Sequence, residues 1–206
     1  MLLDADECQL VLVDYQTRLI PAIADGAAVL ANAVRLARMA QALHVPICVT
    51  EQNPTKLGAS AEALGAVLTE AHAQLVSKMS FSGCADGLGE ILRPAPPKSQ
   101  GGNARSLPKH LQKPSADPPP ARNAVVIAGV EAHVCLLQTA LELLEDEFEV
   151  WVVTDACGSR TERNRDAAYD RLAGNGAELV TTEMVAFEWL RSAEHPLFRE
   201  IHGLIK

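Results

Sequence analysis

The sequence is poor in aromatic residues, which make up only 4% of its 206 residues, and it contains no stripe of lysine and arginine. Proteins that hold single-stranded nucleic acid generally stack its bases on aromatic side chains in a basic groove. The formal net charge of −8 would also repel a phosphate backbone. We therefore expect no nucleic-acid partner.

Long apolar runs and a basic leader are also missing. No run reaches the length of about 18 residues that a membrane span needs. The first residues, MLLDADECQLVLVD, are acidic where a secretory signal is basic. We expect a cytoplasmic protein without a membrane partner. No G-x-G-x-x-G motif follows the first apolar run, which makes a dinucleotide-binding oxidoreductase a weak alternative.

The cysteine pattern excludes a disulfide framework and a zinc site of the usual spacing. None of the cysteines belongs to a C-x-x-C pair, and an odd number cannot close completely into disulfides. No cysteine and histidine cluster has the spacing of zinc ligands. We expect reduced thiols, no metal and no cofactor. The five cysteines are Cys8, Cys48, Cys84, Cys135 and Cys157.

Short apolar runs alternate with amphipathic runs along most of the chain. This pattern predicts an α/β fold with a mostly parallel sheet that helices cover on both faces. Hydrophobic residues make up 48% of the sequence, which is enough for one packed domain spanning residues 1–206. The predicted strands are 9–14, 45–50, 73–78, 124–129, 149–156 and 177–182, and the predicted helices are 27–43, 60–68, 133–145, 163–176 and 183–190.

Residues 93–123 interrupt this alternation. The segment is rich in proline, glycine, serine and lysine, and it shows no repeat. Its composition predicts an irregular, solvated insertion. The alternative is a lid over a site or a contact within an oligomer.

Three ionisable residues lie at the ends of three predicted strands: Asp14 ends the first, Lys78 ends the third, and Cys135 comes just after the fourth. The carboxyl ends of parallel strands meet at one edge of a sheet, so the three side chains can converge there. A lysine beside a thiol stabilises the thiolate, and a carboxylate can accept the thiol proton. Taken singly, each has an ordinary explanation: a turn aspartate, an exposed lysine and a core thiol. Together they predict an activated cysteine nucleophile.

Four blocks of the sequence also match a known family in order and spacing. These are LVLVDYQTRLIPAI, KMSFSG, GVEAHVCLLQTALELL and VVTDACGSRTERNRDAAYDRLAGNGAELVTTEMVAFEWL, and they resemble the isochorismatase-like cysteine hydrolases. The resemblance covers nearly the whole chain outside residues 93–123. The block TEQNPTKLG further resembles a subgroup whose members mostly have no assigned substrate.

The resemblance implies a three-layer α/β/α sandwich with a six-stranded sheet and a catalytic triad of Asp14, Lys78 and Cys135. It implies hydrolysis of a small amide through a thioester. It also implies a cis peptide bond between Val130 and Glu131, which would help the backbone amides of Glu131 and Cys135 form an oxyanion hole. Members of this family suggest a homo-oligomer, a dimer or larger.

The resemblance also indicates which of the family's reactions and substrates not to expect. The member that gives the family its name hydrolyses a vinyl ether without this cysteine, so Cys135 argues against that reaction. The nicotinamidase members hold a metal with an aspartate and histidines between the second and third strands. Here that region contains only His72, too far along the chain, so we expect neither zinc nor nicotinamide.

Four further residues are candidates for contact with a small-molecule substrate: Gln16, Gln52, Phe81 and His133. Ordinary turn polarity explains the two glutamines equally well, Phe81 could be a core aromatic, and His133 could face solvent at a helix start. The alternative to a hydrolase is a non-catalytic protein that keeps the fold as a scaffold or binding module.

Overall fold

A six-stranded parallel sheet forms the centre of the computed structural model, which describes residues 1–94 and 122–206. Its strand order is β3-β2-β1-β4-β5-β6, and every neighbouring pair is parallel. The predicted three-layer α/β/α fold is confirmed. The strands are β1 (Cys8–Val13), β2 (Ile47–Gln52), β3 (Gln74–Lys78), β4 (Ala124–Gly129), β5 (Glu149–Val153) and β6 (Glu178–Val180).

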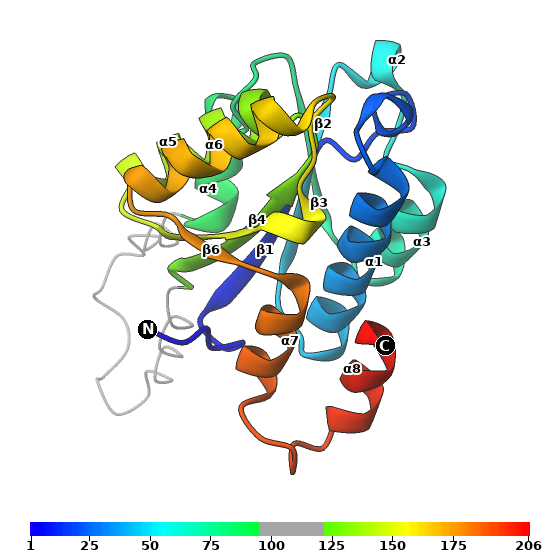
Figure 1. Cartoon of the computed structure of the whole chain (residues 1–206), viewed down its shortest axis with the longest axis vertical. Helices are drawn as coiled ribbons and strands as arrows, with labels where there is room; N and C mark the ends of the chain where they lie inside the picture. Colours follow the sequence, from blue (N-terminus) through cyan, green and yellow to red (C-terminus); the bar gives the residue numbers. More distant parts are fainter. Residues whose placement is uncertain (95–121) are drawn as a thin grey trace, which may run out of the picture.

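Helices cover both faces of the sheet. Figure 1 shows α1, α3, α7 and α8 on one face and α4, α5 and α6 on the other. The described helices include none that is long and apolar enough to cross a membrane. The α-helices are α1 (Gly26–Ala42), α2 (Pro54–Leu57), α3 (Glu62–Glu70), α4 (Leu88–Leu92), α5 (Leu137–Glu145), α6 (Glu162–Gly174), α7 (Thr182–Leu190) and α8 (Phe198–Ile205).

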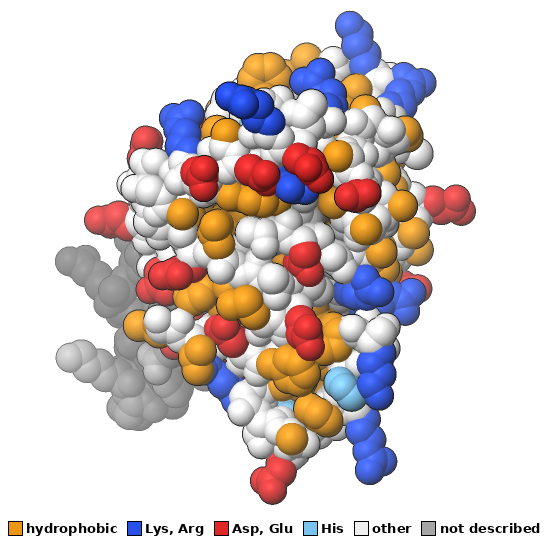
Figure 2. Space-filling model, in the orientation of Figure 1, with side chains coloured by type: hydrophobic (Ala, Val, Ile, Leu, Met, Phe, Trp, Pro, Cys, Tyr) orange, Lys and Arg blue, Asp and Glu red, His pale blue; other side chains and the backbone are white. Residues whose placement is uncertain are grey.

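The central strands are apolar along their whole length because helices cover both sides of them. Every residue of β1, CQLVLV, and of β4, AVVIAG, is buried. At the edge of the sheet, β3 buries only Val76 and Lys78. On the surface, Figure 2 shows Lys and Arg side chains along the upper rim of the molecule and acidic side chains below them.

The chain changes direction across the sheet between β1 and β4. It builds β1, β2 and β3 outward to one side, then returns to place β4 on the other side of β1. Ligands of open α/β sheets bind at such a switch point, beyond the carboxyl ends of the strands. Asp14 follows β1 there, and the segment that leads to Cys135 follows β4.

Most of the predicted insertion, residues 95–121, lies outside the described residues, and so does the alternative of a lid or an oligomer contact. The two flanks of the insertion, at residues 92–93 and 122–123, meet at the end of the sheet where the strands begin. This end lies opposite the switch point. The Arg93 guanidinium donates to Asn123 Oδ1 at 2.8 Å. The Gln9 amide in β1 donates to the carbonyl oxygens of Leu92 and Arg122, at 3.0 and 2.6 Å.

The close approach of β1 and β4 generates a stability prediction. A Cβ atom added at Gly129 would lie 2.6 Å from Val13 Cβ and 2.8 Å from Val13 O. We expect Gly129→Ala to lower the free energy of unfolding by about 1–3 kcal/mol, because overpacking a close contact forces the strands apart. Denaturant titration measures this change.

Gly174→Ala is the matched control. An added Cβ at this end of α6 would meet nothing within 4 Å. Alanine is the better helix former by about 1 kcal/mol, so this variant should be as stable as the original chain or more stable. Equal losses in the two variants would contradict the close approach at Gly129.

Candidate active site

Asp14 and Lys78 form a buried ion pair at the carboxyl edge of the sheet. Lys78 Nζ lies 2.8 Å from Asp14 Oδ2, and both side chains have no exposed surface. The second carboxylate oxygen, Asp14 Oδ1, accepts a hydrogen bond of 2.7 Å from the Thr50 hydroxyl in β2. Asp14 also has a φ of 58°, a left-handed conformation that is uncommon outside glycine. The backbone is therefore turned sharply at the point where it presents this carboxylate.

Lys78 is surrounded by acceptors, which explains how an ammonium can be buried. Besides Asp14, its Nζ donates to Gln52 Oε1 at 2.8 Å, to Phe81 O at 3.0 Å and to Ser80 O at 3.3 Å. A buried charge is tolerated when it is paired and hydrogen-bonded. Lys78 is only 2% exposed, so the alternative of an ordinary surface lysine is wrong.

Cys135 lies in a π-helical turn, Ala132–Leu136, that continues into α5. Single π-helical turns inside helices are frequent at functional sites. The Thr139 hydroxyl donates to Cys135 O at 2.7 Å and accepts from the Gly83 amide at 3.0 Å. It thereby ties the helix that carries Cys135 to the loop that follows Lys78. Sequence reasoning missed Thr139, although its position four residues after Cys135 places it on the same helix face.

The structure brings Cys135 close enough to the ion pair for both charges to act on its thiol. Burial raises the pKa of this thiol to about 12, the Asp14 carboxylate adds to the rise, and the Lys78 ammonium opposes it. Lys78 thus acts in the predicted direction, but burial outweighs it. At neutral pH the resting thiol keeps its proton, so a nucleophilic thiolate requires transfer of that proton to a base. Among the described residues, Asp14 is the carboxylate that acts on this thiol.

The expected cis peptide bond between Val130 and Glu131 is wrong, because no peptide bond of residues 1–94 and 122–206 is cis. The chain instead turns at Glu131 itself, whose φ is 52°. Among the described residues, no backbone or side-chain acceptor receives the Glu131 amide. That N–H is free to bind an oxyanion, which keeps the predicted role of Glu131 open with a different backbone geometry.

His133 belongs to a polar cluster beside the π-helical turn. Its Nδ1 lies 3.0 Å from Ser159 Oγ and 3.4 Å from Glu131 Oε2. Its Nε2 lies 3.4 Å from the Asn164 side-chain nitrogen. The other Glu131 oxygen, Oε1, accepts from Arg160 Nε at 2.8 Å. His133 is thus half-buried and held by neighbours, so the alternative of a histidine that simply faces solvent is wrong.

The two predicted glutamines are bound into the fold beside the ion pair by hydrogen bonds. Gln16 is fully buried, and Gln52 bonds to Lys78. Phe81 is 54% exposed, which excludes the alternative of a core aromatic and leaves its ring available at the edge of the site. Substrate contact by Phe81 and His133 stays a prediction.

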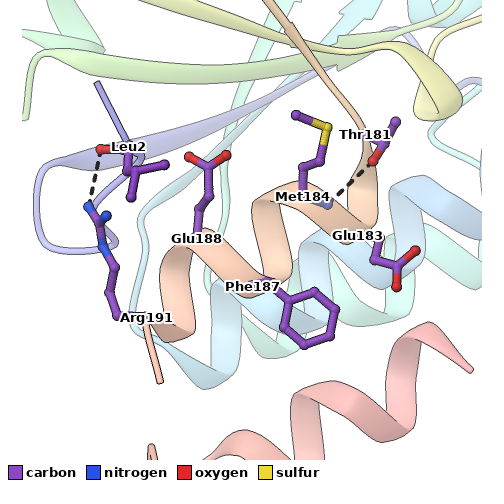
Figure 3. Close-up of a pocket in the computed structure, with 7 residues that line it drawn as sticks. All are labelled: Leu2, Thr181, Glu183, Met184, Phe187, Glu188 and Arg191. Atoms are coloured by element: carbon purple, nitrogen blue, oxygen red, sulfur yellow. Dashed lines mark hydrogen bonds between the residues drawn. The ribbon is translucent and has the colours of Figure 1, made fainter. Parts of the chain in front are cut away.

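The described residues hold no group of three or more histidine, cysteine or acidic side chains that could bind a metal ion. The absence of a metal and a cofactor stays a prediction. A pocket of about 410 Å³ lies elsewhere, against α7 (Figure 3). Leu2, Met184 and Phe187 line it, and its lining includes none of the predicted site residues. It therefore offers no chemistry to the site.

Known proteins are similar to this chain in sequence and in fold. The family model of the isochorismatase domain matches residues 8–99 and 106–184. The mouse isochorismatase domain-containing protein 2A is 35% identical over 197 residues, which cover 96% of this chain and 82% of that protein. The chain belongs to the isochorismatase-like hydrolase family.

Two solved structures illustrate the likeness. The structure of MAR1 ribonuclease from Caenorhabditis elegans has a TM-score of 0.83 and 28% identity, with 100% of this chain and 92% of that chain covered. The Escherichia coli YcaC gene product, described as an octameric hydrolase of unknown specificity, has a TM-score of 0.75 and 24% identity, with 100% and 95% covered. The fold recognised from the motifs is thus the fold of known relatives.

The charges around Cys135 generate opposite predictions for two variants. Asp14→Asn should lower the pKa of Cys135 and speed its alkylation by iodoacetamide at a fixed pH near 8, because the carboxylate raises that pKa. Lys78→Met should slow alkylation, because the ammonium lowers it. Well below the pKa of a thiol, a change of one in that pKa alters the thiolate fraction about tenfold.

Peptide mass spectrometry measures the labelling of each cysteine. Cys84, which is partly exposed and whose pKa burial raises to about 12, is the internal reference. Its rate should be the same in both variants. Alkylation of Cys135 that becomes faster in both variants, or slower in both, would contradict the arrangement.

Proposed function

We propose that the chain is a cysteine-dependent hydrolase that cleaves the C–N bond of a small amide. Cys135 is the nucleophile, Asp14 the general acid and base, and Lys78 the cation that stabilises negative charge on the sulfur. One observation carries the proposal: a buried carboxylate and ammonium, 2.8 Å apart, both act on the same cysteine thiol. A buried ion pair costs free energy unless hydrogen bonds satisfy both of its charges. Charges that shift the pKa of a neighbouring side chain are common at functional sites.

The reaction begins with transfer of the thiol proton to Asp14. The sulfur then attacks the amide carbon, a C–S bond forms, and the carbonyl oxygen becomes an oxyanion. Asp14 returns the proton to the leaving nitrogen as the C–N bond breaks, which releases ammonia or an amine and leaves a thioester. Water then loses a proton to Asp14, attacks the thioester and releases the acid and the thiol. No cofactor takes part.

The backbone amides of Glu131 and Cys135 support the oxyanion in this proposal. The Glu131 N–H has no acceptor among the described residues, so it can bind an oxyanion without breaking an existing bond. The amide of Cys135 lies in the first turn of its helix, where the helix dipole also favours negative charge. Such preorganised donors stabilise the transition state of acyl transfer. A free catalytic thiol also suits a reducing compartment such as the cytoplasm.

A non-catalytic scaffold and a ribonuclease are the competing functions. A scaffold would have no need of a buried ammonium aimed at a thiol. The C. elegans relative is described as a ribonuclease, and basic side chains line the upper rim in Figure 2. The net charge of −8 nevertheless opposes RNA binding. RNA therefore belongs among the test substrates, while a small amide is the substrate we favour.

A screen for ammonia release over a panel of small amides tests the proposal. We expect Cys135→Ala to lower turnover of any active amide by at least about 1,000-fold, because loss of a nucleophile removes the covalent route. Cys84→Ala, which alters a cysteine outside the cluster, should keep turnover within about twofold of the original chain. Unchanged ammonia release in Cys135→Ala would overturn the nucleophile, and Cys135-dependent cleavage of RNA instead of amides would overturn the substrate class.

We further propose that the chain forms a homo-oligomer. The described surface exposes several large apolar side chains, and the E. coli YcaC product is described as octameric. Exposed apolar area that is not functional in the monomer commonly marks a subunit contact. Multi-angle light scattering should give a mass of at least twice that of the 206-residue chain. A monomer mass across micromolar concentrations would contradict this expectation.

A further inference from the structure

We infer that Gln52, held in place by Gln16, is a positioning residue that fixes the Lys78 ammonium between Asp14 and Cys135. The inference deepens the proposed function and rests on it. It assigns both glutamines to the support of the catalytic ion pair rather than to contact with substrate.

The Lys78 ammonium has one charged acceptor and several neutral ones. An ammonium has three N–H donors, and its acceptors here are one carboxylate oxygen of Asp14, the amide oxygen of Gln52 and the carbonyl oxygens of Phe81 and Ser80. Among the described residues, Asp14 is the charged acceptor and the others are neutral. A neutral acceptor directs the ammonium without cancelling its charge, so positive charge remains available to the sulfur.

The sheet itself holds Gln52 beside Lys78. Gln52 ends β2 and is the direct register partner of Lys78 at the end of β3. The Asn53 amide also donates to Lys78 O at 2.9 Å. The backbones of the two residues are therefore fixed side by side. The Gln52 amide nitrogen donates to Met79 O at 2.8 Å, which orients the amide so that its oxygen faces Lys78.

The Gln16 side chain bonds to both backbone polar groups of Gln52. Gln16 Oε1 accepts from the Gln52 N–H at 2.8 Å, and Gln16 Nε2 donates to Gln52 O at 3.0 Å and to Gly58 O at 2.6 Å. Both ends of the Gln16 amide are thus occupied, and the side chain has no exposed surface. The buried Gln16 amide is therefore closed to a substrate, and the Gln52 amide bonds to Lys78 through its oxygen and to Met79 O through its nitrogen. Gln16 therefore acts through the backbone of Gln52, and Gln52 acts through Lys78.

Charge explains why an amide serves here better than a carboxylate. Glutamate has nearly the same size and could accept the same hydrogen bond from Lys78. It would, however, place a second negative charge beside the Lys78 ammonium and close to the Cys135 thiolate that must form. Negative charge beside a thiol disfavours the thiolate.

The test compares Gln52→Glu, Gln52→Leu and Gln74→Glu in the otherwise intact chain. Gln74 is exposed at the start of β3, at the end of the sheet opposite Lys78, so its variant carries the same change of charge outside the cluster. The readout is the pH profile of Cys135 alkylation by iodoacetamide, followed by peptide mass spectrometry. We expect Gln52→Glu to slow alkylation at a fixed pH by about tenfold or more, and Gln74→Glu to stay within about twofold of the original chain. Identical profiles for these two variants would overturn the inference.

Gln52→Leu keeps the test decisive if the glutamate variant does not fold, because it removes the acceptor without adding charge. With an amide from the ammonia screen, a positioning role predicts that kcat falls at least tenfold while KM changes less than threefold. A raised KM with unchanged kcat and an unchanged alkylation profile would show substrate contact and overturn the inference. Alkylation does not depend on turnover. Turnover that persists in Cys135→Ala would therefore contradict the proposed function. An unchanged pH profile of Cys135 alkylation in Gln52→Glu would contradict only the positioning role of Gln52.

Discussion

A fully buried ion pair between Asp14 and Lys78 constrains the whole carboxyl edge of the sheet. Neither charge is tolerated in the interior without the other and without further hydrogen bonds. Asp14 follows β1 and Lys78 ends β3, and these strands are not neighbours, because β2 lies between them. Thr50 and Gln52 of β2 fill this space, and each binds one member of the pair. The intervening strand β2 thus supplies the polar lining that lets the ends of β1 and β3 be bridged by an ion pair.

The same burial determines how the thiol of Cys135 behaves. With a pKa raised to about 12 by burial, the thiol is protonated in the resting state, and a standing thiolate is not available to oxidants or stray electrophiles. In the proposed mechanism it becomes a nucleophile when Asp14 removes its proton during attack on a carbonyl. One arrangement of charges then keeps the Cys135 thiol protonated without substrate and makes it reactive when substrate is bound.

Much of this architecture could be read from the sequence. The continuous apolar runs of β1 and β4 indicated strands buried on both faces, and the rule that parallel strand ends share an edge placed Asp14, Lys78 and Cys135 together. The amphipathic helices were also evident from their periodicity. Helix α8 was missed, because Phe198–Ile205 is short, contains Gly203 and buries only Ile201.

Other features depend on tertiary contacts that no local pattern encodes. The π-helical turn at Ala132–Leu136 looks like ordinary helix in sequence, and the left-handed backbone at Glu131 replaced the cis bond that the resemblance implied. The inward roles of Gln16 and Gln52 became visible only when their hydrogen-bond partners were known. A glutamine after a strand looks the same in the sequence whether its side chain faces solvent or an ammonium.

The flanks of the insertion are held at the end of the sheet that lies opposite Cys135. Gln9 bridges Leu92 and Arg122, and Arg93 bonds to Asn123, so the described chain leaves and re-enters the fold through neighbouring, hydrogen-bonded points. A cut between those two points would leave each flank attached to the sheet by its own hydrogen bonds. Under the proposed function, the reaction takes place at the other end of the sheet, away from both flanks.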